Sequence, residues 1–338
     1  MSDYSPLDRF LHRLALGPLA EMLHDIERGR FLKDAPPADG SHVFVTGLAR
    51  AGTTILMREI HATGQFASLT YADMPFVLAP NSWAKLSRKG QKPGKRAERA
   101  HGDGIEVDFQ SPEALDEVYW RVADGKAYIR ADHLAPHRPD KEVMDGYIDL
   151  MRLVMRAKGT ARYVSKNNNN ILRLGPLAKA LPRSTFLVPL RDPLQHARSL
   201  LAQHQRFLKA DAFTQSYMTW LGHHEFGATH RPFRFGDKLE GDPQTLDYWL
   251  RLWLQVHKAL LPVESQLSNI AFVPYEALGR DPVLWRMIAR RIEVQAGPLS
   301  EIKPTDDRDP GPHNKSLAAE ARDLHARLSE RARLKLMA

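Results

Sequence analysis

Residues 47–54, GLARAGTT, have the types and spacing of a loop that binds phosphate. Gly47 and Gly52 allow backbone N–H groups to converge on one anion, and the loop follows a β-rich run and opens a helical pattern. Thr53 stands where a triphosphate-binding loop has its lysine, while Arg50 brings a cation inside the loop. The pattern predicts an anion site and argues against triphosphate hydrolysis, with a plain strand–turn–helix corner as the alternative.

A second cluster suited to phosphate occurs at residues 190–199, LRDPLQHARS. Arg191 falls at the carboxyl end of a predicted strand, where α/β sheets bind ligands, and Asp192 and Pro193 fit the cap and first turn of a helix. Ser199 follows about two turns along that helix. A guanidinium and a hydroxyl placed this way suit a terminal phosphate monoester. The alternative for Arg191 is a surface ion pair.

The elements that must position these residues are indicated by short β-rich runs that alternate with helical patterns. The runs lie at residues 42–46, 66–70, 163–165, 185–190 and 270–274. Strands that alternate with helices are typical of a parallel sheet covered on both faces. We therefore expect an α/β fold with a central parallel sheet flanked by helices.

The chain is expected to form a single domain over residues 1–338. We expect an N-terminal helical segment at 1–35, the α/β core at 40–295, an insertion at 207–242 that contributes to the acceptor site, and a C-terminal helix at 316–336. Residues 85–99 are cationic and contain glycine, which predicts a loop. Whether that loop acts as a lid stays open.

The composition narrows the range of partners. The 338 residues carry 48 Lys and Arg against 40 Asp and Glu, a net charge of +8, which favours anionic ligands. The absence of cysteine excludes disulfides, thiolate zinc sites and a cysteine nucleophile. Basic runs at 85–99 and 327–335 lack interleaved aromatic residues, so nucleic acid is not an expected partner. Without a secretory leader or a long apolar stretch, we expect a cytoplasmic protein that does not insert stably into a membrane.

Together the two phosphate-binding elements resemble those of the PAPS-dependent sulfotransferase family, whose members use 3′-phosphoadenosine 5′-phosphosulfate (PAPS). In that family a loop like residues 50–54 holds the 5′-phosphosulfate, and a strand and helix like residues 191–199 hold the 3′-phosphate. Residues 275–282, YEALGRDP, also resemble a later family segment, so the resemblance covers about residues 40–295. It implies a P-loop NTPase-like sulfotransferase fold and transfer of a sulfuryl group from PAPS to a hydroxyl or amine.

Two residues depart from the family pattern and indicate which branch of the family the chain resembles. Ala51 replaces the usual serine, and Arg50 replaces the lysine of the soluble small-molecule branch. The chain is therefore more similar to the tyrosylprotein and carbohydrate branches, in a bacterial type, and this implies a small molecule, a glycan or a peptide as acceptor. The identity of the acceptor and the oligomeric state stay open.

The resemblance also implies which residues bind PAPS. They are Arg50, Ala51, Gly52, Thr53, Thr54, Arg191, Ser199, Tyr275 and Lys315. Lys166, at the end of a predicted strand, matches a family lysine near the bridging oxygen, and we expect it to stabilise charge together with Arg50; a solvent-facing lysine is the alternative. No metal is expected, because the histidines and glutamate within residues 223–230 lack the spacing of a zinc site and indicate a hydrogen-bonded or acceptor-facing cluster.

A hydroxyl acceptor also needs a general base. The small-molecule branch has a histidine two residues after its lysine, but Asn168 occupies that position here and cannot accept a proton. By resemblance to the tyrosylprotein branch, whose carboxylate follows the second strand, Asp73 is the first candidate, followed by His101 and Glu106. The alternative for Asp73 is the N-cap of a helix that begins near Pro75.

Two alternatives belong to other functional classes. A P-loop kinase or NTPase needs a lysine after Gly52 and an aspartate for magnesium at a strand end, and Thr53 argues against the first requirement. A non-catalytic protein that binds a nucleotide or nucleic acid would show basic and aromatic residues interleaved along one face. Sulfuryl transfer from PAPS without a metal is the function we expect.

Overall fold

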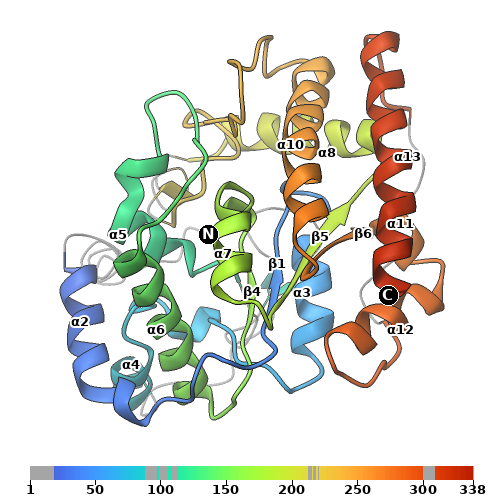
Figure 1. The fold of residues 1–338 in the computed structure, drawn as a ribbon. Coiled ribbons are helices and arrows are strands. Elements are labelled where there is room, and N and C mark those ends of the chain that lie inside the picture. Colours follow the sequence, from blue (N-terminus) through green and yellow to red (C-terminus); the bar gives the residue numbers. More distant parts are fainter. Residues whose placement is uncertain are drawn as a thin grey trace.

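The computed structural model describes residues 19–87, 97–98, 106–107, 113–211, 215, 218–219, 221–299 and 309–337. Its centre is a parallel sheet of four strands in the order β4-β1-β5-β6. These strands are β1 (Val43–Val45), β4 (Val164–Lys166), β5 (Thr185–Leu190) and β6 (Ile270–Pro274). Helices surround the sheet (Figure 1), so the predicted α/β fold with a central parallel sheet flanked by helices is confirmed.

The register of the sheet brings the carboxyl ends of the strands to one edge. Val45 of β1 pairs with Lys166 of β4 on one side and with Leu187 of β5 on the other. Beyond them, Leu190 at the end of β5 pairs with Pro274 at the end of β6. This edge is where α/β sheets bind ligands, and both predicted phosphate-binding elements start from it.

The run at residues 66–70 does not form the full strand that we expected. Ala67 forms a parallel bridge to the residue before β4, and Thr70 is a second isolated bridge residue. Thr70 forms a capping box with Asp73 and opens the short 3-10 helix η2 (Tyr71–Asp73). Side-chain hydrogen bonds to the backbone compete with a sheet ladder, so the strand ends early.

Alternate residues along the strands pack into two separate cores. Phe44, Phe186 and Phe272 belong to one core, in which the rings of Phe44 and Phe186 stack with centroids 4.7 Å apart. Val45 and Leu187 belong to the other core. The first core includes residues of α6 (Lys141–Lys158), α7 (Leu174–Ala180), α8 (Pro193–Leu208), α10 (Leu246–Gln266) and α13 (Lys315–Met337), and the second includes residues of α3 (Thr53–His61), α11 (Tyr275–Leu278) and α12 (Pro282–Arg291).

A group of shorter elements packs around α6, on the left of Figure 1. It comprises α2 (Ala20–Phe31), η1 (Leu32–Asp34), α4 (Pro80–Ser87) and α5 (Glu117–Tyr128). The 3-10 helix η3 (Asn168–Arg173) follows β4, and β2 (Ala97–Glu98) pairs with β3 (Glu106–Val107) in a separate antiparallel ribbon. Over the described ranges, no helix combines the length and apolar character needed to cross a bilayer.

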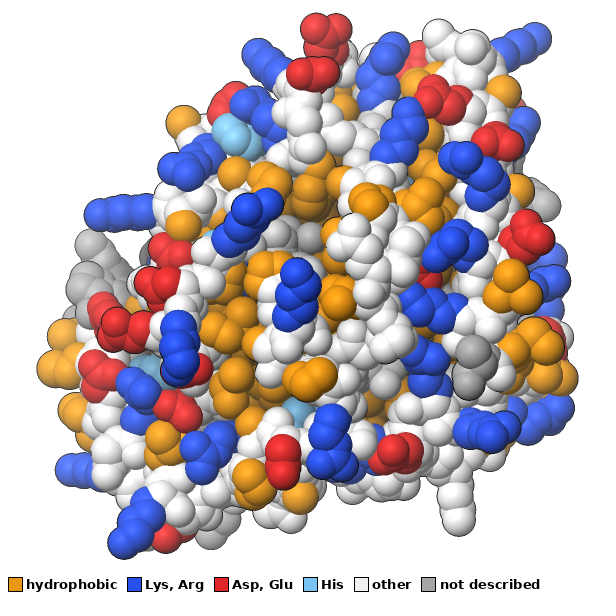
Figure 2. Space-filling model, viewed as in Figure 1, with side chains coloured by type: hydrophobic (Ala, Val, Ile, Leu, Met, Phe, Trp, Pro, Cys, Tyr) orange, Lys and Arg blue, Asp and Glu red, His pale blue; other side chains and the backbone are white. Residues whose placement is uncertain are grey.

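Charge is interspersed over the face of the molecule drawn in Figure 2. Lys and Arg side chains are spread over it with Asp and Glu scattered among them, while hydrophobic side chains gather near the middle of the view. Exposed ion pairs occur on the described surface, such as Lys141–Asp145 and Lys258–Glu320, each at 2.5 Å. Interspersed charge of this kind is typical of a solvated surface.

Candidate active site

The loop between β1 and α3 has an unusual backbone. Gly47, Arg50 and Gly52 have φ angles of 151°, 70° and 92°, and two of these positions are glycines that tolerate positive φ. Arg50 is the exception, because a side chain in the left-handed region costs about 1–2 kcal/mol. Gly52 caps α3, so the N-terminus of that helix and its positive end face the loop. A loop of this form offers backbone N–H groups to an anion.

Tyr275, the first residue of α11 directly after β6, packs on the loop. A Cβ at Gly52 would lie 2.2 Å from Cε2 of Tyr275, which real side chains do not allow. Burial raises the pKa of Tyr275, so the phenol stays neutral. The expected PAPS residue Tyr275 thus contacts the loop, and it explains why position 52 requires glycine.

Arg191 lies against the same loop. Its Nη1 donates a hydrogen bond to the carbonyl oxygen of Arg50 at 3.0 Å. The following residue, Asp192, caps α8 by accepting the N–H groups of Leu194 and Gln195, as predicted. The N–H of Asp192 donates to Glu276 at 2.8 Å, which ties the end of β5 to the segment after β6. The two predicted phosphate-binding elements therefore meet at one place.

The side chain of Arg50 extends to α8 and joins the two elements by a second contact. Its Nε donates to Oγ of Ser199 at 3.2 Å. Two guanidinium groups and a hydroxyl, from Arg50, Arg191 and Ser199, consequently belong to one cluster beside the loop. This combination is suited to bind a phosphate by charge-assisted hydrogen bonds.

His196, which no sequence pattern indicated, binds the loop from α8. The ring is fully buried in α8, and its Nε2 lies 2.8 Å from the carbonyl oxygen of Ala49. Burial lowers the pKa of His196 well below its usual range, so the ring is neutral and donates an N–H to that oxygen. A histidine one turn into a helix has no distinguishing pattern, because its partner is far away in the sequence.

Lys166 ends β4 with a buried side chain that is 9% exposed, so it is not the solvent-facing lysine of the alternative. Its Nζ lies 3.6 Å from Oε1 of Glu113. The nearby Asn168 accepts a hydrogen bond from Oγ1 of Thr53 at 3.2 Å and donates one to Oε1 of Glu225 at 3.2 Å. These contacts connect the end of β4 to the first residue of α3, beside the glycine loop.

Asp73, the first candidate for the base, makes contacts of a structural kind. Both carboxylate oxygens lie within 2.9 Å of Nζ of Lys158, and Oδ2 also accepts from the N–H and hydroxyl of Thr70. Asp73 therefore closes the η2 turn, whereas we had considered an N-cap for a helix near Pro75; the next helix, α4, begins at Pro80. Both carboxylate oxygens of Asp73 therefore have partners within its own part of the fold.

Three further expected residues are not brought to this cluster by any described contact. Lys315 is exposed at the first residue of α13, and the preceding residue, Asn314, donates its N–H to Asp247 of α10. His101 lies outside the described residues, and Glu106 is described only as part of the backbone of β3.

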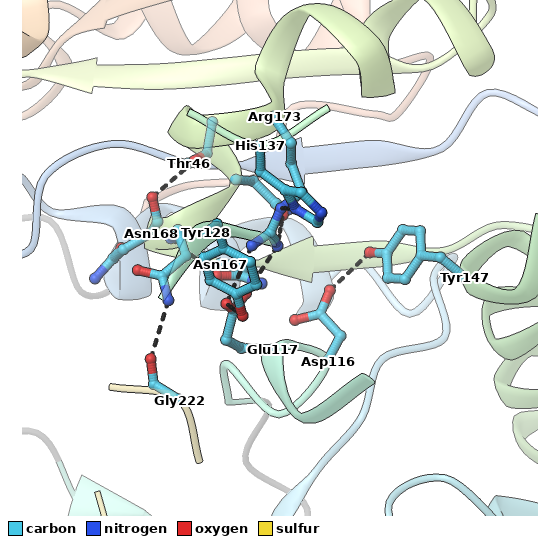
Figure 3. Close-up of polar contacts among 12 residues, drawn as sticks. Thr46, Asp116, Glu117, Tyr128, His137, Tyr147, Asn167, Asn168, Arg173 and Gly222 are labelled. Carbon is cyan, nitrogen blue, oxygen red and sulfur yellow. Dashed lines mark hydrogen bonds and ion pairs between the residues drawn. The ribbon is translucent and has the colours of Figure 1, made fainter. Parts of the chain in front are cut away.

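A buried ionic network lies beneath the end of β4 (Figure 3). Arg173 and Glu117 form a fully buried ion pair at 2.9 Å, and Asn167 donates to the same carboxylate at 2.7 Å. Burial alone would raise the pKa of Glu117, but the Arg173 guanidinium holds it below the usual range. The ring of Trp120 lies 4.6 Å from the Arg173 guanidinium carbon. The network thus fixes Asn167, the neighbour of Lys166 in the chain.

On the other side of Lys166, Ser165 donates to the carboxylate of Asp116, which also accepts from the hydroxyl of Tyr147 at 2.7 Å. Burial raises the pKa of Asp116. Buried hydrogen bonds therefore hold both chain neighbours of Lys166 in place. In the described part of the chain, no group of three or more His, Asp or Glu residues is arranged to hold a metal ion.

Comparison with known proteins shows what the whole chain is similar to. A model of the sulfotransferase family matches residues 42–295. The solved structure of sulfotransferase STF1 from Mycobacterium tuberculosis H37Rv aligns with a TM-score of 0.51 and 15% identity, covering 95% of this chain and 80% of that one. Sulfotransferase STF9 from Mycobacterium avium aligns with a TM-score of 0.48 and 13% identity, covering 97% and 79%. No sequence among the curated proteins matches the chain.

Proposed function

Because the chain belongs to the sulfotransferase family, we propose that it transfers a sulfuryl group from PAPS to a hydroxyl or amine acceptor and releases adenosine 3′,5′-bisphosphate. The observation that carries the proposal is the convergence of Arg50, Arg191 and Ser199 beside the glycine loop. A donor with phosphate at both ends of one nucleoside needs two anion sites a short distance apart. The loop and this cluster are the two anion sites that we propose for it.

In this proposal Arg191 and Ser199 bind the 3′-phosphate, and the loop with Thr53 and Thr54 binds the 5′-phosphosulfate. The side chain of Arg50 extends from the loop to Ser199, so it is suited to serve both phosphates. Tyr275 keeps the loop in shape by packing on Gly52. A triphosphate is not favoured, because Thr53 occupies the position of the required lysine.

The chemistry demanded of these residues is positioning and charge stabilisation. As the acceptor oxygen forms its bond to sulfur, the bond from sulfur to the bridging oxygen breaks and its electron pair leaves with the 5′-phosphate. By analogy with phosphoryl transfer, cations and N–H groups aimed at the leaving oxygen lower the barrier. We assign this role to Lys166, whose buried ammonium is held at the end of β4, together with Arg50.

We further propose an acceptor of the kind used by the tyrosylprotein and carbohydrate branches, a glycan, a peptide or a small hydroxyl compound. The support is Arg50 in place of the lysine of the small-molecule branch, and Asn168 in place of its histidine. Both replacements fall in the site itself.

Calorimetric titration with adenosine 3′,5′-bisphosphate, adenosine 5′-phosphate and ATP tests the donor site. We expect the bisphosphate to bind most tightly. Arg191→Ala should weaken the bisphosphate by about tenfold or more, since charge-assisted hydrogen bonds are worth about 1.5–3 kcal/mol, and should affect adenosine 5′-phosphate far less. Preference for ATP, or equal losses for both adenosine ligands, would contradict the proposal.

A further inference from the structure

Residues 221–225, LGHHE, bring a histidine and a carboxylate to the end of β4. Oε1 of Glu225 accepts the hydrogen bond from Asn168, whose other side-chain atom binds Thr53 of α3. Nδ1 of His223 lies 3.7 Å from Oε2 of Glu225, and both side chains are 10% exposed. A histidine–carboxylate pair therefore stands beside the loop and Lys166, although the sequence expectation for these residues was only a hydrogen-bonded or acceptor-facing cluster.

The backbone just before His223 is fixed by the buried network. Gly222 has a φ of 79°, and a Cβ there would lie 2.7 Å from Cγ of Glu117. Its carbonyl oxygen accepts a hydrogen bond from Nδ2 of Asn169 at 3.0 Å, and Figure 3 shows Gly222 at the edge of this network. Glu117 and Asn169 thus hold the 221–225 segment against the turn that follows β4.

The orientation of the pair assigns a role to each member. A carboxylate facing Nδ1 favours the tautomer with its proton on that atom, which leaves a lone pair on Nε2. Burial alone would raise the pKa of Glu225, but His223 and Lys166 hold it below the usual range, so it remains ionised and orients the ring. The segment also contains His224, on which the charges of Arg231 and Glu117 act.

Resting on the proposed function, we propose that His223, oriented by Glu225, is the general base of sulfuryl transfer. Nε2 of His223 takes the proton of the acceptor hydroxyl as the oxygen lone pair forms the new bond to sulfur. The electron pair of the broken bond to the bridging oxygen leaves with adenosine 3′,5′-bisphosphate. The imidazolium then returns its proton to water, so atoms and charge balance.

The other described candidates are committed elsewhere. Asp73 is paired with Lys158, and Glu113 lies beside Lys166 and accepts the hydroxyl of Tyr71 at 3.1 Å. Burial lowers the pKa of the adjacent His224 to about 4, which makes it a weak proton acceptor near neutral pH. His223 combines a partly accessible ring with an orienting carboxylate.

The test compares three variants, His223→Gln, Glu225→Gln and the control His133→Gln. His133 also pairs with a carboxylate, Asp132 at 2.6 Å, but on the turn between α5 and α6. The measured reaction is hydrolysis of radiolabelled PAPS, followed as released sulfate from pH 5 to 9. Water is the acceptor in this reaction and must also lose a proton, so the natural acceptor need not be known. Affinity for adenosine 3′,5′-bisphosphate is measured alongside.

His223→Gln should lower the rate by about 100- to 10,000-fold with bisphosphate affinity unchanged, and should make the rate less dependent on pH than that of the wild type. Glu225→Gln should lower it by a smaller factor, and His133→Gln should not change it. Wild-type rates in His223→Gln, with bisphosphate still bound, would overturn the assignment of the base alone. Failure of the wild type to bind bisphosphate would instead overturn the proposed function.

Discussion

Two residues of the glycine loop adopt left-handed backbone conformations for different reasons. At Gly52 the ring of Tyr275 occupies the space that a side chain would need. Arg50 is strained, and its contacts offset the strain: Arg191 binds its carbonyl oxygen and its own guanidinium binds Ser199. Strain that surrounding contacts maintain is typical of functional loops. The strain at Arg50 therefore distinguishes this loop from an ordinary connection between a strand and a helix.

Gly52→Ala should both destabilise the protein and damage the site. The added methyl has to displace the buried Tyr275 ring, which we expect to cost about 2 kcal/mol or more and to weaken adenosine 3′,5′-bisphosphate. The matched control is Gly64→Ala, because Gly64 has a φ of 73° with nothing within 4 Å of the added Cβ. That control should cost about 1 kcal/mol and leave bisphosphate affinity unchanged. Chemical denaturation and calorimetry measure both; equal behaviour of the two variants would count against the packing account.

At the scale of elements, the ends of β1, β5 and β6 are joined into one unit. His196 in α8 holds the carbonyl oxygen of Ala49, and Glu276 after β6 holds the N–H of Asp192 at the start of α8. The cap of α8 thus belongs to the proposed donor site as well as to the helix. Other helices of the fold have caps of the same kind that touch no site residue.

This difference can be measured with two capping aspartates. Asp192 caps α8, and Asp140 caps α6 by accepting the N–H of Val143. Removing either carboxylate with alanine should cost about 0.5–2 kcal/mol of unfolding free energy, because each leaves helix N–H groups without an acceptor. Only Asp192→Ala should also weaken adenosine 3′,5′-bisphosphate, since it loosens the turn that positions Arg191. If both variants bound bisphosphate like the wild type, the link between cap and site would be wrong.

Local sequence patterns were sufficient to predict many of the strands and helices. Alternation of β-rich runs with helices predicted the parallel sheet, and the Asp192-Pro193 pair predicted the start of α8. The prediction of a full strand at 66–70 was wrong because the Thr70–Asp73 capping box ends the strand. That capping box depends on side-chain geometry. The His223–Glu225 pair could not be placed, because its position depends on long-range contacts to Asn168 and Glu117 that no local pattern contains.

At the scale of the whole molecule, several histidines lie buried or half-buried and have lowered pKa values. Burial lowers the pKa of His224, His230 and His257 to about 4. The ring of His257 stacks on Trp253 with centroids 4.1 Å apart and donates from Nδ1 to the carbonyl oxygen of that residue. Folding therefore requires these rings to remain unprotonated.

The stability of the protein should consequently fall as the pH is lowered from about 6.5 towards 4. Below the unfolded pKa of about 6.5 the unfolded chain binds protons that the folded chain excludes, so each such histidine destabilises the fold by about 2 kcal/mol at pH 5. Urea denaturation at pH 7 and pH 5 measures the change. His257→Gln should reduce it; equal unfolding free energies of the wild type at both pH values would contradict this expectation.

The central claim is that the molecule moves a sulfuryl group from a doubly phosphorylated adenosine donor. It is tested most directly by incubating the purified protein with radiolabelled PAPS and a panel of phenols, sugars and peptides, with radiolabelled ATP in a parallel series. We predict transfer of label from PAPS to at least one acceptor, dependent on Arg191 and Lys166, and none from ATP. Label transferred from ATP, or transfer from PAPS that persists unchanged in Arg191→Ala and Lys166→Ala, would contradict the account.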